Sequence, residues 1–342
     1  MPDAGSWLVY SLGNLGAARR TFEGGTGDDT VRIGIGLAVS GGPNTLAALV
    51  KEAQRAEEAG FASIWLSNIF SFDALTVLAL AGKETQRVEL GTFVVPTYPR
   101  HPAALAQQAL TVQAATNGRL ALGIGLSHQV VIENMFGLDY SKPIPHTKEY
   151  LTVLNGLLAQ EPVRFTGELY RVAAQLTVPG ASKPTVLIAA LGPAMLRLAG
   201  RLADGTATWM GGLDYLRDVA VPTITEAASR ARKPAPRIVA GLPVCVTDDA
   251  AAARTIAAKT FAVYGQLPSY RATLDRGGAA GPEDVAVIGT EDEVAKQIEA
   301  FAAVGVTDFN AAIYGPPGAD PRRTYELLSS LAKGRQPVGN RH

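Results

Sequence analysis

From residue 31 onwards the chain alternates between two hydrophobic patterns. Short, continuous apolar runs rich in β-branched residues are each followed by a longer stretch whose apolar residues recur at helical spacing. The runs predict eight strands, at 31–37, 62–67, 87–96, 119–125, 184–191, 205–210, 236–247 and 306–313. The periodic stretches predict helices at 45–61, 73–84, 102–116, 144–159, 193–203, 213–231, 248–265, 291–305 and 321–334, with a bend at Pro222 in the sixth of these.

This succession of strands and helices predicts the fold class. Strands that are apolar along their whole length belong to a sheet covered on both faces. Regular strand–helix alternation predicts a parallel sheet, and eight such units favour a closed (β/α)8 TIM barrel. The alternative is an open doubly wound sheet, which usually has fewer strands. We expect one barrel domain at 31–334, with a poorly ordered extension at 1–30 and a tail at 335–342.

Two stretches interrupt the alternation. Residues 160–183 predict a small hairpin with Gly167 at its turn, and residues 265–285 predict an irregular lid or insertion. Loops of this length inside compact domains are usually functional.

Composition narrows the class of protein. The 31 basic residues balance the 31 acidic residues, so the chain lacks the basic surface typical of nucleic-acid binders. No apolar run is long enough to span a membrane, and residues 1–30 lack the apolar core of a signal peptide. The single cysteine, Cys245, lies in an apolar run, and no His/Cys cluster has zinc spacing. We expect a cytoplasmic protein that binds a small molecule, without metal, nucleic-acid or membrane partners.

Polar residues follow the predicted ends of neighbouring strands. Arg100 and His101 come just after the third strand, and His128 and Gln129 just after the fourth. In a (β/α)8 barrel these loops gather at one mouth, where catalytic groups collect. His101, His128 and His146 are all expected on that side. A histidine beside a proline at a helix start is often only a cap, so their shared side is better evidence than any one of them.

The segment "AALGPAMLRLAG" (189–200) predicts an anion-binding turn. Gly192 permits close approach to the backbone, and Pro193 occupies the first turn of a helix. Free amides and the helix dipole at such a terminus favour an anion such as phosphate. A tight strand-to-helix turn without a ligand is the plain alternative. The "GIG" at 123–125 lacks the third glycine of a dinucleotide fingerprint.

Two segments carry a resemblance to a known family. "GTFVVPTYPRHPAALAQQALTVQAATNGRLALGIGLSH" (91–128) and "VLIAALGPAMLRLAGRLADGTATW" (186–209) resemble the bacterial luciferase-like monooxygenase superfamily. Within it, the chain is similar to the actinobacterial branch that uses the deazaflavin coenzyme F420, and the resemblance extends over residues 31–333. It implies a (β/α)8 barrel, a flavin or deazaflavin in the mouth, and a homodimer.

The resemblance also implies where the cofactor lies. A non-proline cis peptide in the third strand, at Phe93–Val94 or Val94–Val95, would support the central ring, and the turn after the fifth strand would hold the phosphate. Relatives often carry an acidic or histidine pair after the second strand. Here the neutral Ser67 and Asn68 stand there, which can hold a pyrimidine edge but are not strong proton donors. The cofactor-binding residues implied are Ser67, Asn68, Thr92, Phe93, Val94, Val95, Ser127, Gln129, Ala190, Leu191, Gly192, Pro193, Ala194 and Met195.

The first functional hypothesis is an oxidoreductase that moves a hydride between reduced F420 and a small organic acceptor. His128 is the expected general acid, because imidazole titrates near neutral pH, and Tyr264 and Tyr270 are alternatives. Trp65 and Trp209 either wall the pocket or pack in the core. A second hypothesis is an FMN-dependent monooxygenase that uses reduced flavin and oxygen. A third is a barrel without cofactor that serves as a binding or structural protein. The sequence does not identify the substrate.

Overall fold

The computed structural model describes residues 30–37, 45–317 and 319–334, so nearly all of the expected extension and the whole expected tail lie outside it. Within these residues eight parallel strands pair in chain order, and the last pairs with the first, which closes a barrel. The strands are β1 (Arg32–Gly36), β2 (Ser63–Leu66), β3 (Glu89–Thr92) with β4 (Val95–Pro96), β5 (Leu120–Gly125), β8 (Thr185–Ile188), β9 (Gly205–Trp209), β10 (Arg237–Val246) and β12 (Asp308–Ile313). The predicted (β/α)8 barrel is confirmed.

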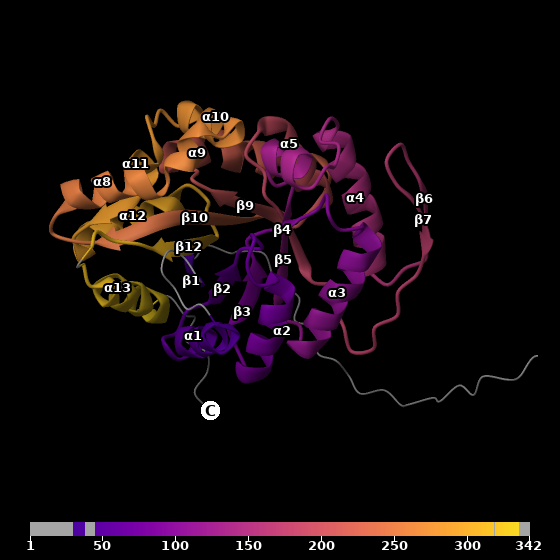
Figure 1. The fold of residues 1–342 in the computed structure, drawn as a ribbon, viewed down its shortest axis with the longest axis horizontal. Helices are drawn as coiled ribbons and strands as arrows, with labels where there is room; N and C mark the ends of the chain where they lie inside the picture. Colours follow the sequence, from indigo (N-terminus) through magenta and orange to yellow (C-terminus); the bar gives the residue numbers. More distant parts are fainter. Residues whose placement is uncertain (1–29, 38–44, 318, 335–342) are drawn as a thin grey trace, which may run out of the picture.

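Helices surround the strands, as Figure 1 shows. Thr45, Asp73 and Asp249 each cap a helix by accepting a hydrogen bond from a backbone N–H in its first turn. The helices that alternate with the strands are α1 (Leu46–Glu58), α2 (Ala74–Glu84), α3 (Pro102–Ala115), α4 (Pro143–Leu158), α5 (Pro193–Leu202), α7 (Val221–Arg230), α8 (Ala250–Thr260), α12 (Glu291–Ala303) and α13 (Pro321–Gly334). No helix in the described part of the chain is long and apolar enough to cross a membrane.

Two predicted helices are divided in the structure. The helix expected at 213–231 consists of α6 (Leu213–Tyr215), the π-helical segment η2 (Leu216–Ala220) and α7. Pro222 has no N–H for the preceding turn, and the departure from α geometry comes just before it. The helix expected at 248–265 breaks at Phe261 into α8 and α9 (Ala262–Gln266).

The two interruptions differ in outcome. The predicted hairpin is confirmed as β6 (Val163–Thr166) paired antiparallel with β7 (Arg171–Ala174), and Figure 1 shows it outside the barrel, next to α4. The prediction of an irregular segment at 265–285 is wrong. That segment contains α10 (Pro268–Arg276) and α11 (Pro282–Val285), and β11 (Val287–Gly289) then extends the sheet beside β10. Because α10 buries only Thr273 and Leu274, it has no apolar stripe to predict it.

The barrel interior is filled by two aromatic side chains. Trp65 is 1% exposed, and a Cβ on Gly34 or Gly91 would collide with its ring at 2.9 and 2.1 Å. The Phe93 ring meets Trp65 edge-on, with centroids 5.9 Å apart, and occupies the space that a side chain on Gly241 would take. Of the two readings for Trp65, core packing is therefore the one observed.

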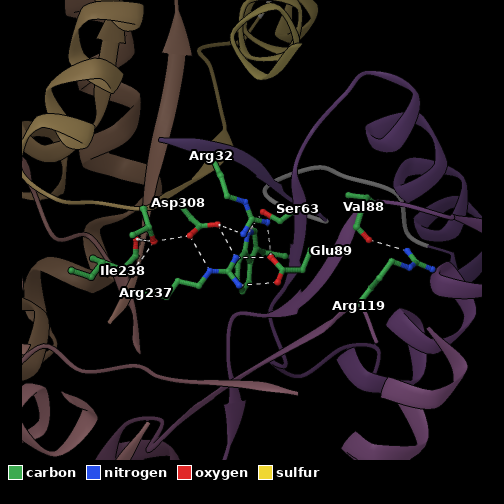
Figure 2. A network of polar contacts seen from close by, with 10 residues as sticks. Arg32, Ser63, Val88, Glu89, Arg119, Arg237, Ile238 and Asp308 are labelled. Atoms are coloured by element: carbon green, nitrogen blue, oxygen red, sulfur yellow. Dashed lines mark hydrogen bonds and ion pairs between the residues drawn. The ribbon is translucent and has the colours of Figure 1, made fainter. Parts of the chain in front are cut away.

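The amino-terminal end of the barrel is closed by charged residues, each the first residue of its strand. Arg237 donates to Asp308 at 2.7 Å and to Glu89 at 2.8 Å, and Arg32 donates to Glu89 at 2.9 Å. Figure 2 shows the Arg237 guanidinium between the two carboxylates. Two positive and two negative charges thus neutralise one another under Trp65, whose ring lies 5.6 Å from the Arg237 guanidinium carbon.

Candidate active site at the barrel mouth

The third strand leaves the sheet just where the mouth begins. Between β3 and β4 the Phe93–Val94 peptide is cis, at the first of the two positions that the resemblance implied. Thr92 Oγ1 bridges the gap, because it donates to the Gly123 carbonyl at 2.7 Å and accepts from the Gly123 N–H at 2.9 Å. A Cβ on Gly123 would lie 2.1 Å from the Thr92 carbonyl oxygen. Only glycine at this position allows β5 to pass so close to the bulge.

The bulge forms a ledge that faces the mouth. Phe93 and Val94 are only partly buried, although they lie at the centre of a closed sheet whose neighbouring residues are fully buried. Ser67, which follows β2, donates from Oγ to the Phe93 carbonyl at 3.1 Å and so links the bulge to the end of the neighbouring strand β2. We call Phe93 and Val94 the ledge.

Asn68 has a structural task of its own. Its Oδ1 accepts from the Ala74 N–H at 2.9 Å, in the first turn of α2. Its side-chain NH₂ group can still donate to a ligand. Ser67 is exposed, while its hydroxyl proton is directed to Phe93.

A notch follows β8. Gly192 precedes α5 in an extended conformation, with φ −86°, and no side chain caps this helix. A Cβ at Gly192 would meet nothing within 4 Å, so the space in front of the turn is open. Pro193 has no N–H, and the amides of Ala194 and Met195 belong to the first turn, where α-helices leave such donors unpaired. We call Ala190–Met195 the notch.

The carbonyls of the notch are directed away from the open side. The hydroxyl of the buried Tyr215 donates to the Leu191 carbonyl. The Gly192 carbonyl accepts from the Leu196 N–H at 2.9 Å, and the Ala190 carbonyl accepts from Thr206 Oγ1 at 3.5 Å. With its carbonyls bonded, the turn presents mainly its N–H groups. No sequence pattern points to Tyr215 or Thr206, because both act through contacts between distant parts of the chain.

Ledge and notch are neighbours. A Cβ on Gly125, the last residue of β5, would lie 2.7 Å from a Val94 methyl and 3.0 Å from the Ala189 Cβ. Ala189 directly precedes the notch. A ligand that rests on the ledge thus reaches the notch across a single glycine.

His128 lies at the same rim and meets the segment between β10 and β11. Its ring is 5.6 Å from that of Tyr270 in α10, and Tyr270 is 5.0 Å from Tyr264 in α9. Tyr264 in turn lies 5.8 Å from Trp209 at the end of β9. Burial lowers the pKa of His128 and raises that of Tyr264. At neutral pH the His128 imidazole is therefore uncharged and Tyr264 keeps its proton.

The other two histidines predicted on this side have structural roles. His101 is exposed, and its Nδ1 accepts from the Ala103 N–H at 3.2 Å as the cap of α3. His146 is buried, stacks on Tyr98 with ring centroids 3.9 Å apart, and lies 2.9 Å from the Thr97 hydroxyl. Burial lowers the pKa of His146 to about 4. Neither ring belongs to the ledge or the notch.

Two further predicted residues occupy the loop that leaves β5. Ser127 has a positive φ of 62°, which turns the chain sharply before His128. Gln129 is exposed and donates to Glu133 at 3.0 Å, just before the π-helical segment η1 (Val130–Met135). Arg100, on the adjacent loop, donates to Asp73 and to Gln108, so its charge is already paired.

The arrangement fits a planar ring that carries a phosphate. The ledge offers an apolar support for the ring, and the notch offers unpaired amides and open space for the anion. Both lie at the carboxyl ends of barrel strands, which places the chain among the (β/α)8 barrels that bind ligands and do chemistry in the mouth.

Comparison with known proteins identifies the family. The family model of luciferase-like monooxygenases matches residues 30–308, and the chain belongs to this family of oxidoreductases. An uncharacterised Mycobacterium tuberculosis protein is 32% identical over 251 residues, which cover 69% of this chain and 74% of the relative. An F420-dependent glucose-6-phosphate dehydrogenase from Intrasporangium calvum is 32% identical over 203 residues, which cover 54% and 60%. The resemblance to the F420-dependent branch is thereby confirmed.

Solved structures with the same fold include users of both cofactors. An F420-dependent secondary alcohol dehydrogenase in complex with an F420–acetone adduct superposes with a TM-score of 0.74 at 20% identity, covering 88% of this chain and 98% of the other. The oxygenating constituent of 3,6-diketocamphane monooxygenase from Pseudomonas putida, in complex with FMN, gives 0.68 at 18% identity, with 89% and 97% covered. At these identities the likeness concerns the fold.

Proposed function

We propose that the protein is an F420-dependent oxidoreductase that transfers a hydride between the reduced deazaflavin and a small organic acceptor. The observation that carries the proposal is the contact of ledge and notch around Gly125. F420-dependent enzymes among the relatives support the choice of cofactor.

The protein's own residues bind and orient. Phe93 and Val94 support one face of the ring, which leaves the other face to the acceptor, and the amides of Ala194 and Met195 hold the phosphate. When bound, the reduced deazaflavin supplies a hydride. Reduction of a carbonyl or an activated alkene takes both electrons with the hydride and then needs one proton to neutralise the resulting anion. We assign this proton to the protonated form of His128, which is the minor form at neutral pH.

The same ledge and notch would accept FMN. A monooxygenase that uses reduced flavin and oxygen is therefore the second candidate, supported by the FMN-bound structural neighbour. A barrel that binds neither cofactor is the outcome that would exclude both.

Titration of the purified chain with F420 and with FMN tests the proposal. We expect micromolar or tighter binding of F420 and weaker binding of FMN. Gly192→Leu places a side chain in the open notch and is expected to weaken F420 binding at least about tenfold, or about 1.4 kcal/mol. Its thermal midpoint should not change, because the backbone angles suit any residue and the added Cβ meets no atom.

Gly334→Leu is the matched control, since Gly334, at the end of α13, also has no atom within 4 Å of its missing Cβ. It should bind F420 as the native chain does. If the native chain and Gly192→Leu bind F420 with equal affinity, the phosphate does not bind in the notch. Tighter binding of FMN selects the monooxygenase, and binding of neither cofactor rejects both enzymes.

A further inference from the structure

We propose that the acceptor is an uncharged molecule with a planar apolar body, such as an aromatic or alicyclic ketone, and not a phosphorylated or carboxylated compound. This inference rests on the proposed function and names the substrate class of the same mouth. It separates the chain from its glucose-6-phosphate dehydrogenase relatives.

A continuous row of four rings borders the mouth. The row runs from Trp209 through Tyr264 and Tyr270 to His128, with successive centroids 5.8, 5.0 and 5.6 Å apart. Each of these four residues is partly buried. The row begins beside the ledge, because a Cβ on Gly241 would touch Phe93 at 2.7 Å and Trp209 at 3.1 Å. We call these four residues the aromatic wall.

The row consists of edge-on and tilted ring contacts, with interplanar angles of 72°, 80° and 54°. Edge-on contacts between neighbours leave ring faces that a planar ligand can stack against. We infer that the acceptor lies between wall and ledge, and we call this place the slot; both surfaces that border it are largely hydrophobic.

The basic side chains near the slot are already engaged in hydrogen bonds within the protein. Arg254 donates to the Glu283 carbonyl at 3.1 Å, and Arg271 pairs with Asp275 at 2.7 Å and donates to two carbonyls. Arg276 donates to the Ala272 carbonyl at 3.1 Å.

On the side of the mouth formed by the loop after β4, the basic side chain in the described part of the chain is that of Arg100. Arg100 is engaged by Asp73 and Gln108. A phosphate or carboxylate in the slot would lose its water without gaining a cation there, which is costly.

The rim around the slot is apolar as well. Ile69 and Phe70 follow β2 and are 60% and 68% exposed, and Met135 and Phe136 follow β5 and are 61% and 42% exposed. The rings of Phe70 and Phe136 lie 6.0 Å apart, so the two loops meet at the rim. A neutral ligand would thus pass apolar residues before it reaches the slot, where the His128 imidazole offers a hydrogen bond to its carbonyl.

A matched pair of ligands tests the substrate class. Acetophenone and its para-carboxylate share one aromatic body and differ in one negative charge. Binding to the F420-loaded protein is measured by saturation-transfer NMR, which needs no turnover. We expect acetophenone to bind at least about tenfold more tightly, and Tyr270→Leu to weaken it roughly two- to tenfold, the range for loss of one aromatic contact.

Tyr325→Phe is the control, because Tyr325 packs edge-on against Phe61 on the outer surface, away from the mouth. It should leave acetophenone affinity unchanged. The inference is overturned if the carboxylate binds equally or better, if acetophenone does not bind at millimolar concentration, or if Tyr270→Leu binds it as well as the native chain. F420 titration of the same samples reports separately on the proposed function.

Discussion

At the residue scale, the three histidines predicted near the mouth differ only in their surroundings. His101 caps a helix, His146 stacks on Tyr98, and His128 alone belongs to the aromatic wall. The sequence predicts that all three follow strands on one side, because that depends on chain order. Which of them reaches the ligand depends on contacts between loops, and these are absent from local patterns. The same holds for Tyr215, whose hydrogen bond to the Leu191 carbonyl joins residues 24 positions apart in the chain.

Replacement of His128 tests its role as proton donor. His128→Gln keeps a hydrogen-bonding side chain but has no titratable proton, and we expect turnover to fall by about 10²-fold. F420 affinity should change little, because His128 lies on the wall and not in the ledge or the notch. His101→Asn, which keeps a side-chain cap on α3, is the control and should turn over as the native chain does.

The pH profile gives a second readout for His128. Burial lowers the pKa of this imidazole below its ordinary value of 6.5. The acid form is therefore present at low pH and is lost as the pH rises through that lowered pKa. Native turnover should decline with rising pH, with a midpoint below 6.5, and this step should be missing in His128→Gln. A profile that is identical in both proteins contradicts the assignment.

At the scale of elements, the carboxylate of Asp73 joins two helices. Asp73 caps α2 by accepting from the Thr76 N–H at 2.9 Å, and it also pairs with Arg100 and accepts from Gln108 of α3. Burial opposes ionisation of this group, but hydrogen bonds from Arg100 and Thr76 outweigh it and lower its pKa. The Arg100 that the sequence singles out thus fastens the loop after β4 to α2.

Asp73→Ala should cost more than loss of a cap alone. Removal of an N-cap costs about 1 kcal/mol, and the lost partners of Arg100 and Gln108 should raise the total to about 2 kcal/mol. Asp249→Ala, which removes only the cap of α8, is the matched comparison. Urea unfolding of both variants measures the difference, and equal losses would show that the link to α3 contributes nothing.

Strands and helices could be predicted where an apolar pattern in the sequence reflects burial of the element in the core. Every barrel strand lies in an apolar run, so all eight were found, while α10 was missed because it buries only Thr273 and Leu274. The third strand was predicted as unbroken at 87–96, since an apolar run gives no sign of a bulge. Its position came from the family resemblance. Gly123, which makes room for the bulge, was noted only as part of an incomplete glycine motif.

At the scale of the whole molecule, stability and ligand binding occupy opposite ends of the barrel. Glu89, Arg237, Arg32 and Asp308 close the amino-terminal end, and the ledge, notch and aromatic wall surround the other. Because the ion network lies at one end, the sequence of the mouth loops can change without disturbing it. This separation is typical of (β/α)8 barrels.

Asp308→Asn should destabilise the whole barrel. Asp308 is 1% exposed, and removal of its charge leaves the Arg237 and Arg32 guanidinium groups with one carboxylate between them. Loss of one partner from a buried ion network costs about 3 kcal/mol. Urea unfolding at pH 7 measures the change. Glu226→Gln, from the exposed pair with Arg230, is the control and should leave the midpoint nearly unchanged.

The stability difference should depend on pH in a defined direction. Burial opposes ionisation of Asp308, but the charges of Arg237 and Arg32 outweigh it and hold the pKa of this carboxyl below its ordinary value of 3.8. Its contribution is complete above that value and is lost as the pH falls through the lowered pKa. The gap between native chain and Asp308→Asn should be constant near neutrality and should shrink only in strong acid. A gap that shrinks at pH 6 would point to another group.

The filled barrel interior has a consequence for the order of events. With Trp65 and Phe93 in the bore and the ion network beneath them, nothing can enter or leave through the far end. All ligands must therefore enter and leave through the mouth at the carboxyl ends of the strands. A ligand that rests on Phe93 and Val94 lies deeper than one that stacks on Tyr270. The deeper ligand must therefore bind first and dissociate last. Binding to this chain would then be ordered, with the ligand on the ledge bound before the acceptor and released after it.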